Sequence, residues 1–522
     1  MAVENKIGSC IGTVRRLSIM AVATVALCLP AFAVEHELGY EATLSAGFGS
    51  GDFAPSYMSA NNNGVITQPN TTTLRLSTGG ALWNDHNFTF CYGADVIGGY
   101  ASKTNYGLYD AEAEAIVPRE AKTAPLWLHQ LYAEASYRSL FATVGMKEGY
   151  SVLLNQDLSS GDLCFSGNTR PMPGVTFGCV DFQNIPLTNG WVQINGALGY
   201  YKTLDKKWKE NRFNYYNSFI STDYVLNYKY LHLRTNPAKP FSLTIGMQAA
   251  CQVGGTTTHY VKGEVTKVVK NKLGFKDMLR ALIPGSGGED VGDQVYYSGN
   301  HVGTWDVMGR YRFQSGAELM LYYQSPWEDG SGIGKLNGFD GLYGIEYISS
   351  GEGVMDGAVV EYLDLMNQSG PIHWAPGDHP GTPIGSQATG SDDYYNNYDY
   401  DGYQYFGQAL GSPMIRTSLY NTDGYMRITD NRIRAFHLAV KGHIGDNFDF
   451  RMKFGYRKSW GTPFIPLTAT RSATSFMLEG KYRFSGIDGL SVCAQFGMDS
   501  GELLGKNVGG QVSISYSGIF GK

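Results

Sequence analysis

The sequence predicts an all-β protein, and more closely a transmembrane antiparallel β-barrel. Three observations support this fold class. The first residues have the pattern of an export signal, and the rest of the chain alternates apolar and polar residues with period two. The chain after that signal also lacks a run of about 18 apolar residues that could form a transmembrane helix. A barrel needs only about 9 to 11 alternating residues per strand, because its backbone polar groups pair between strands.

Residues 1–33 are predicted to be a secretory signal peptide. Lys6, Arg15 and Arg16 precede an apolar segment, Leu17 to Leu29, and Ala31-Phe32-Ala33 forms a small-x-small cleavage site. We expect the mature chain to begin near Val34. A lipoprotein signal is the weaker interpretation, since Leu27 rather than a small residue precedes Cys28.

Residues 34–522 are predicted to form one outer-membrane β-barrel domain. The composition of 67 Gly, 36 Tyr, 13% aromatic and 17% charged residues is uniform along the chain, without a linker or a clear repeat. The formal net charge is −6, and the basic residues of the signal make the remainder more acidic still. This charge argues against nucleic acid or an anionic lipid surface as a partner.

Cysteine and histidine patterns predict neither a disulfide framework nor a metal site. Beyond the signal there are five cysteines, an odd and sparse set, and no CxxC motif or Cys/His cluster. Cys164 and Cys179 could form one bridge, but the favoured interpretation is that both are small residues at strand ends. We therefore predict no cofactor.

Alternation continues from the N-terminal to the C-terminal strand. In the first segment Leu38, Tyr40 and Leu44 lie on one face, and Glu41 and Thr43 lie on the other. Similar segments are found at 88–96, 130–138, 192–200, 241–248, 319–323, 448–457 and 511–520. Since the polar faces carry full charges in mid-strand, they must meet water or a polar lumen. A soluble sandwich is the alternative fold, but the terminal segment resembles strands that outer-membrane barrels present to their insertion machinery.

Two stretches interrupt this strand pattern. Val261 to Ile283 has apolar residues at near-helical spacing among lysines and predicts a short loop helix. It could lie at the membrane interface, although packing on the barrel rim is the favoured interpretation. Gly370 to Gly402 is rich in Gly, Pro, Asp, Asn and Tyr and predicts a long extracellular loop.

Ser166 to Pro173 predicts a rigid loop between strands, because Pro171 and Pro173 fix their φ angles. Such a loop can fold into a barrel as a plug, or it can present Asn168 and Arg170 to a ligand. Both interpretations remain open from sequence.

Further candidate residues lie in two loops. Trp327-Glu328-Asp329 precedes Gly330-Ser331-Gly332, where a turn is favoured over a Ca²⁺ loop, since only two adjacent carboxylates are present. Tyr394, Tyr395, Asn397 and Tyr398 belong to a tract that combines aromatic rings with amides and carboxylates. Such rings stack on sugars while the polar groups bind hydroxyls, although the tract could equally pack over the barrel mouth.

Catalytic motifs give little support for an enzyme. The sequence has no GxSxG elbow, HExxH motif, P-loop or complete dinucleotide fingerprint. His301 with Ser298 could imitate the pair of an outer-membrane phospholipase, but we predict a protein without enzymatic activity.

Several blocks in a fixed order resemble the capsule assembly Wzi family, in the form found in Bacteroides-like bacteria. The blocks are Leu126 to Glu134, Gly145 to Glu148, Leu158 to Gly161, Ser166 to Pro173, Gly299 to Trp305, Pro326 to Gly332, Asp340 to Gly344, Glu361 to Leu363, Asn367 to Pro371, Tyr394 to Tyr398, Gly411 to Pro413 and Arg457 to Gly461. Thr169 and Met172 stand where the family usually has Ala and Ile. The enterobacterial form also has a periplasmic helical bundle at its N-terminus, whereas strand-like residues start at Leu38 here.

The resemblance implies an outer-membrane barrel of about 18 strands that binds capsular polysaccharide and organises the capsule at the cell surface. Outer-membrane lipid and the barrel insertion machinery are the other expected partners. A diffusion channel for small sugars is the alternative function. The candidate polysaccharide-binding residues are Asn168, Arg170, Trp327, Glu328, Asp329, Tyr394, Tyr395, Asn397 and Tyr398.

Overall fold

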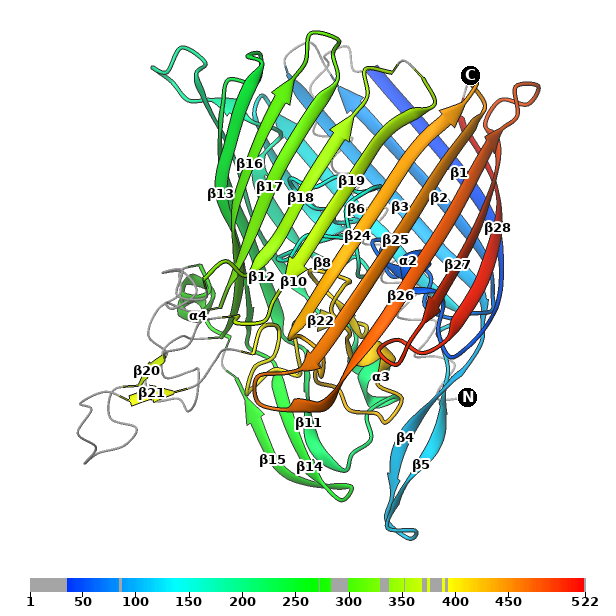
Figure 1. The fold of residues 1–522 in the computed structure, drawn as a ribbon, viewed down its shortest axis with the longest axis vertical. Coiled ribbons are helices and arrows are strands. Elements are labelled where there is room, and N and C mark those ends of the chain that lie inside the picture. The colour runs from blue at the N-terminus through cyan, green and yellow to red at the C-terminus, as the bar shows by residue number, and fades with distance from the viewer. Residues whose placement is uncertain are drawn as a thin grey trace, which may run out of the picture.

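Eighteen antiparallel strands close into a barrel in the computed structural model (Figure 1), which describes residues 35–83, 87–271, 273–282, 299–328, 338–351, 353–368, 373–375, 387–389 and 393–520. The barrel strands are β1 Glu35–Ser50, β2 Thr71–Trp83, β3 Phe88–Ala101, β6 Leu126–Tyr137, β7 Leu140–Met146, β8 Pro173–Cys179, β10 Val192–Lys202, β12 Val225–Thr235, β13 Phe241–Val253, β16 Asn300–Arg312, β17 Glu318–Trp327, β18 Gly341–Ile348, β19 Met355–Asp364, β24 Ile433–Ile444, β25 Phe448–Gly461, β26 Pro466–Arg483, β27 Leu490–Ser500 and β28 Asn507–Ile519. The predicted fold class and strand number are confirmed. The predicted signal peptide lies outside the described residues.

Pairing of the first and last strands closes the barrel. Leu44 of β1 lies opposite Ile514 of β28, and Leu74 of β2 lies on its other side. Inside the barrel, the Thr43 and Ser515 hydroxyls are 2.8 Å apart. The pairing therefore preserves the predicted alternation, with apolar residues outward and polar residues inward.

The sequence located some strands and missed others. β2 was missed because Thr72, Thr78 and Gly80 share its outward face with leucines and weaken the apolar pattern. Where the outward positions hold large apolar residues, as in β1 and β28, alternation identified the strand.

Large apolar side chains cover the outer surface of the barrel. Leu44, Leu231 and Ile514 are 53%, 54% and 48% exposed. A continuous apolar surface of this kind is unfavourable in water but suits the hydrocarbon region of a bilayer. The outer surface thus has the character of a membrane-facing wall.

The two ends of the barrel differ in their connections. Short turns, such as residues 138–139 and 445–447, join strands at the end that also holds Glu35 and Ile519, and we call this the short-turn end. Longer connections project from the opposite, long-loop end, at the bottom of Figure 1. These connections and the remaining segments hold α2 Ser56–Ser59, β4 Thr104–Asp110, β5 Ala115–Ala121, β9 Gln183–Asn184, α3 Lys206–Glu210, β11 Asn217–Thr222, β14 Thr256–Val261, β15 Glu264–Lys270, α4 Phe275–Arg280, β20 His373–Ala375, β21 Gln387–Thr389, β22 Gln404–Tyr405, β23 Gln408–Ala409 and η2 Ser418–Tyr420. Within the described ranges, none of the helices has the length and apolar character needed to cross a membrane.

The predicted loop helix is much shorter than the stretch from Val261 to Ile283. β14 and β15 form a hairpin there, and only α4, Phe275–Arg280, is helical. Lys262 and Gly263 join the two strands with φ of +48° and +85°, values that suit a tight hairpin turn. The β-branched valines of β15 also favour a strand. The Tyr200 hydroxyl of β10 donates a hydrogen bond of 2.8 Å to the Met278 carbonyl, so α4 packs against the barrel wall as the favoured interpretation expected.

We predict that Ile514→Arg destabilises the barrel by about 2–4 kcal/mol, because a charge would then face the middle of the hydrocarbon layer. The measurement is urea unfolding in lipid vesicles, followed by tryptophan fluorescence. Ser515→Arg is the matched control, since its side chain faces the lumen and should cost much less. Equal costs for the two variants would contradict the assignment of the outer face.

Candidate functional site

Residues 147–172, between β7 and β8, fold into the barrel, and we call them the first plug segment. Glu361 of β19 accepts hydrogen bonds from the Ser159 hydroxyl and the Ser160 backbone N–H, both at 2.7 Å. On another part of the wall, the side-chain amides of Gln248 and Gln324 donate to the Asp162 carboxylate at 2.9 and 2.8 Å. The wall therefore holds this segment through buried polar groups that need partners.

Residues 393–432, between β19 and β24, form a second plug segment beside the first. The Tyr403 hydroxyl donates to the Cys164 carbonyl at 2.9 Å, and Tyr395 bonds through its hydroxyl to Leu163. Tyr394 and Tyr395 stack with ring centroids 4.5 Å apart. The two segments thus pack as one body inside the lumen. Cys164 and Cys179 are both free thiols in this arrangement.

The loop from Ser166 to Pro173 belongs to the contact between the two plug segments. The Asn168 side-chain amide donates to the Ala409 carbonyl at 3.0 Å, and the Ser166 hydroxyl donates to Gly411 at 2.7 Å. Asn168 is buried by these contacts. The sequence left open whether this loop is a plug or presents Asn168 and Arg170 to a ligand. The position of Asn168 agrees with the plug.

Arg170 has a different environment, because aromatic rings cover its guanidinium. The Arg170 guanidinium carbon lies 4.5 Å from the ring centre of Trp127 and 4.6 Å from that of Phe406. Burial lowers the pKa of Arg170 to about 10, so the side chain stays protonated at neutral pH. Among the described residues, no carboxylate forms an ion pair with it.

The tyrosine tract divides into buried and exposed members. Tyr394 and Tyr395 are 1% and 0% exposed, so they pack in the interior. Asn397 is buried and donates to the Asn300 side chain at 3.3 Å, whereas Tyr398 is 53% exposed. Tyr398 is the member of the predicted set that a large ligand could reach.

The predicted cluster around Trp327 is also mostly internal. Trp327 is 1% exposed and packs directly on Gly303, where a Cβ would lie 2.1 Å from its ring. The Glu328 carboxylate accepts a hydrogen bond from the Tyr395 backbone at 2.8 Å. Asp329 lies outside the described residues. Trp327 thus packs within the barrel wall, and Glu328 helps to hold the second plug segment in place.

A hollow of about 250 Å³ opens at the long-loop end, and we call it the loop-end hollow. It is lined by Asp393, Asn396, Asn397, Tyr398, Tyr425, Arg427, Ile428, Thr462, Phe464 and Ile465. Three chain segments, distant in sequence, meet here. Aromatic rings stand beside amide, carboxylate and guanidinium groups, a combination that suits a ligand with hydroxyl groups and apolar ring faces.

Internal hydrogen bonds fix the shape of the loop-end hollow. Asn396 donates to the Ile428 carbonyl at 2.8 Å and accepts from the Ile428 N–H at 3.1 Å. The guanidinium of Arg427 lies 3.8 Å from the Asp393 carboxylate, whose pKa is raised by burial. The hollow therefore presents a prearranged set of polar groups next to Tyr398 and Phe464.

Sequence reasoning missed Tyr425, Arg427 and Phe464. The first two carry no local signal, because only the second plug segment brings them beside Asn396. Phe464 does carry a local signal, because it is an apolar residue in the brief connection between β25 and β26 at the long-loop end. It is 56% exposed. Its neighbour Ile465 is 60% exposed, so the two residues form a small apolar patch at the hollow.

Asp95, His129 and Glu148 form a cluster whose ligand atoms lie within 4.8 Å of one another. Arg75 supplies the positive charge at this cluster: its Nε donates to the Asp95 carboxylate at 2.8 Å, and its Nη2 donates to the Glu148 carboxylate at 2.8 Å. The cluster thus ties the start of the first plug segment to β2, β3 and β6. Burial acts to raise the pKa of Glu148, but the hydrogen bond from His129 and the charge of Arg75 outweigh it and lower the pKa to about 2.

The barrel fold is shared with solved outer-membrane proteins. The chain is similar to Wzi of Escherichia coli, an outer-membrane protein of group 1 capsule assembly described as a carbohydrate-binding β-barrel, with 12% identity, a TM-score of 0.53, and 91% of this chain and 83% of that chain covered. It is also similar to OccK3 (OpdO) of Pseudomonas aeruginosa, with 12% identity, a TM-score of 0.44 and coverage of 93% and 96%. OpdK of the same organism, solved with vanillate, gives 9% identity, a TM-score of 0.46 and coverage of 93% and 99%. No protein-family model and no curated protein matches the sequence.

We predict that the Glu148 cluster stabilises the plugged barrel in a pH-dependent way. The pKa of Glu148 falls from 4.5 to about 2 on folding, so its contribution is complete above pH 4.5 and is lost as the pH falls toward about 2. The measurement is the melting temperature in detergent at several pH values. Wild type should exceed Glu148→Gln at neutral pH, and the gap should shrink below pH 4.5. A gap that is constant across this range would contradict the role of the ionised carboxylate.

Proposed function

We propose that this protein is an outer-membrane barrel of the capsule assembly type that binds surface polysaccharide without chemical change and helps to attach it to the cell. The observation that carries the proposal is the loop-end hollow, where exposed Tyr398 and Phe464 flank Arg427, Asp393 and two asparagines. Sugar rings offer apolar C–H faces to aromatic side chains and hydroxyls to amides and carboxylates. The likeness to a carbohydrate-binding capsule barrel agrees with this chemistry.

The orientation of the barrel supports a cell-surface ligand. In outer-membrane barrels the short turns face the periplasm and the longer loops face outward. By this rule the loop-end hollow opens at the cell surface, where an extended polysaccharide is present. Membrane lipid would contact the apolar outer face, and strand β28, with Tyr516 and Phe520 near its end, would serve the barrel insertion machinery.

A diffusion channel for small sugars is the alternative function. The two plug segments argue against it, because buried contacts such as Tyr403 to Cys164 and Ser159 to Glu361 fill the lumen with packed chain. A freely open channel would need these segments to leave their wall contacts. We therefore rank polysaccharide binding above diffusion.

Binding of purified polysaccharide tests the loop-end hollow directly. Tyr398→Ala combined with Phe464→Ala should weaken retention of the native surface polysaccharide by about tenfold or more, since stacking on an aromatic ring contributes on the order of 1 kcal/mol per contact. Affinity electrophoresis through a polysaccharide-containing gel measures this effect. Tyr216→Ala, another exposed tyrosine in a long loop, is the control and should migrate as wild type. Equal retention of all three proteins would remove the hollow as the site.

Gene deletion and planar-bilayer conductance separate the two functions. We expect a deletion strain to shed polysaccharide into the medium, and the purified wild-type barrel to conduct weakly. Replacing Glu361 and Gln324 by Ala should raise conductance, because it removes bonds that hold the first plug segment. A large steady conductance of the wild type, with polysaccharide fully retained by the deletion strain, would favour the diffusion channel.

A further inference from the structure

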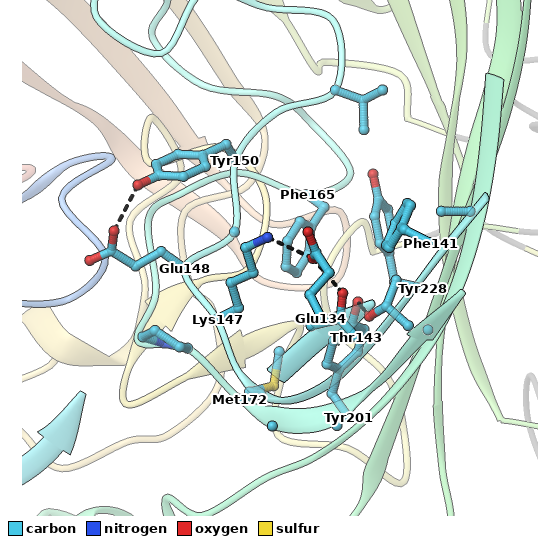
Figure 2. A pocket seen from close by; sticks show the side chains of 18 of the residues that line it. Glu134, Phe141, Thr143, Lys147, Glu148, Tyr150, Phe165, Met172, Tyr201 and Tyr228 are labelled. Atoms are coloured by element: carbon cyan, nitrogen blue, oxygen red, sulfur yellow. Dashed lines mark hydrogen bonds and ion pairs between the residues drawn. The ribbon is translucent and has the colours of Figure 1, made fainter. Parts of the chain in front are cut away.

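A second recess lies inside the barrel, on the other side of the first plug segment from the long loops. It has a volume of about 520 Å³, within the usual range of about 300 to 1,000 Å³ for small-molecule sites. Its lining includes Glu134, Thr143, Lys147, Phe165, Arg170 and Tyr228, and Figure 2 shows most of these side chains gathered around one space. We call it the luminal chamber.

Aromatic rings make up one side of the luminal chamber. Phe165 of the plug and Tyr228 of β12 stack with ring centroids 4.6 Å apart, and Tyr230 lies next to Tyr228 at 6.1 Å. Tyr201 of β10 shares a hydrogen bond of 2.7 Å with Thr176. Rings from both the wall and the plug therefore enclose the space and offer both apolar surface and hydroxyl groups.

Most charges that border the chamber already have partners. Lys147 donates to the Glu134 carboxylate at 2.6 Å, and the Thr143 hydroxyl donates to the same carboxylate at 2.6 Å, as Figure 2 shows. Glu148 accepts from Arg75 at 2.8 Å and from the Tyr150 hydroxyl at 2.7 Å. The acidic groups of the chamber are thus neutralised by neighbouring side chains.

Arg170 is the exception among these charges. Trp127 and Phe406 cover the guanidinium near its centre, and in the described part of the chain no carboxylate pairs with it. The Arg170 Nε–H donates a long hydrogen bond of 3.5 Å to the Gly64 carbonyl. A carboxylate can accept two parallel hydrogen bonds from the two terminal nitrogens of a guanidinium. The chamber therefore combines an unpaired positive charge with aromatic stacking surface.

We propose that the luminal chamber is a binding site for a short acidic saccharide, with a uronic acid carboxylate on Arg170 and a sugar ring against the Tyr228 and Tyr230 side. The chamber also reaches Phe141 at the start of β7 and Cys179 at the end of β8, both at the short-turn end. The saccharide enters from that end. By the orientation rule this is the periplasmic side, so the site is separate from the loop-end hollow and does not depend on it.

Titration calorimetry with digalacturonic acid on the full-length barrel in detergent tests this proposal. Arg170→Gln should weaken binding by about tenfold or more, because it removes a charge-assisted bond. Glu134→Gln should strengthen binding severalfold, because it removes a negative charge and frees Lys147 for the ligand. Opposite effects of the two variants would not follow from a general loss of folding, and Glu134→Gln alone still decides the test if Arg170→Gln fails to fold.

The remaining arms of the experiment distinguish the luminal chamber from the loop-end hollow. The Tyr398→Ala and Phe464→Ala double variant should bind digalacturonic acid as wild type does, and the neutral disaccharide maltose should bind more weakly than the acidic one. The proposal is overturned if digalacturonic acid gives no binding up to about 10 mM, a range that covers even weak sites. It is also overturned if the loop-end variant abolishes binding while both chamber variants leave it unchanged. Either result leaves the test of the loop-end hollow with native polysaccharide intact.

Discussion

The hydrogen bonding between the barrel wall and the first plug segment is the interaction on which the rest of the structure depends. Glu361 lies on an inward face and is 1% exposed, and its carboxylate is satisfied by Ser159, by the Ser160 backbone and by the Tyr322 hydroxyl. A buried charge without such partners is costly, and a plug without wall contacts would lose its fixed position. Wall and plug therefore stabilise each other.

This mutual dependence divides the lumen into two recesses with different chemistry. The second plug segment, held through Tyr395 and Tyr403, forms the base of the loop-end hollow and brings Asn396 beside Ile428. The opposite side of the first segment forms one wall of the luminal chamber. One packed body thus shapes the loop-end hollow of about 250 Å³ and the larger luminal chamber of about 520 Å³, which reaches toward the short-turn end.

A barrel fold does not determine function by itself, because an outer-membrane barrel can enclose an open channel or a plugged lumen. The decision lies in what occupies the lumen and in which side chains reach solvent. Here inward polar side chains of several wall strands form hydrogen bonds with the first plug segment. Tyr398 and Phe464, at the long-loop end, are the exposed aromatic residues of the loop-end hollow. That balance favours recognition over diffusion.

The sequence by itself determined that the chain is rich in strands with two different surroundings, because its residues alternate with period two and carry charges in mid-strand. The export signal and the terminal strand then favoured a membrane barrel over a soluble sandwich. It also indicated a rigid loop at Ser166 to Pro173, since proline fixes φ. Only the tertiary structure decided that Tyr394 and Tyr395 are buried while Tyr398 is exposed, and that Val265 belongs to a hairpin rather than a helix. The physical reason is that the plug and the hollow are formed by contacts between segments far apart in the chain. The local composition of one segment does not predict such contacts.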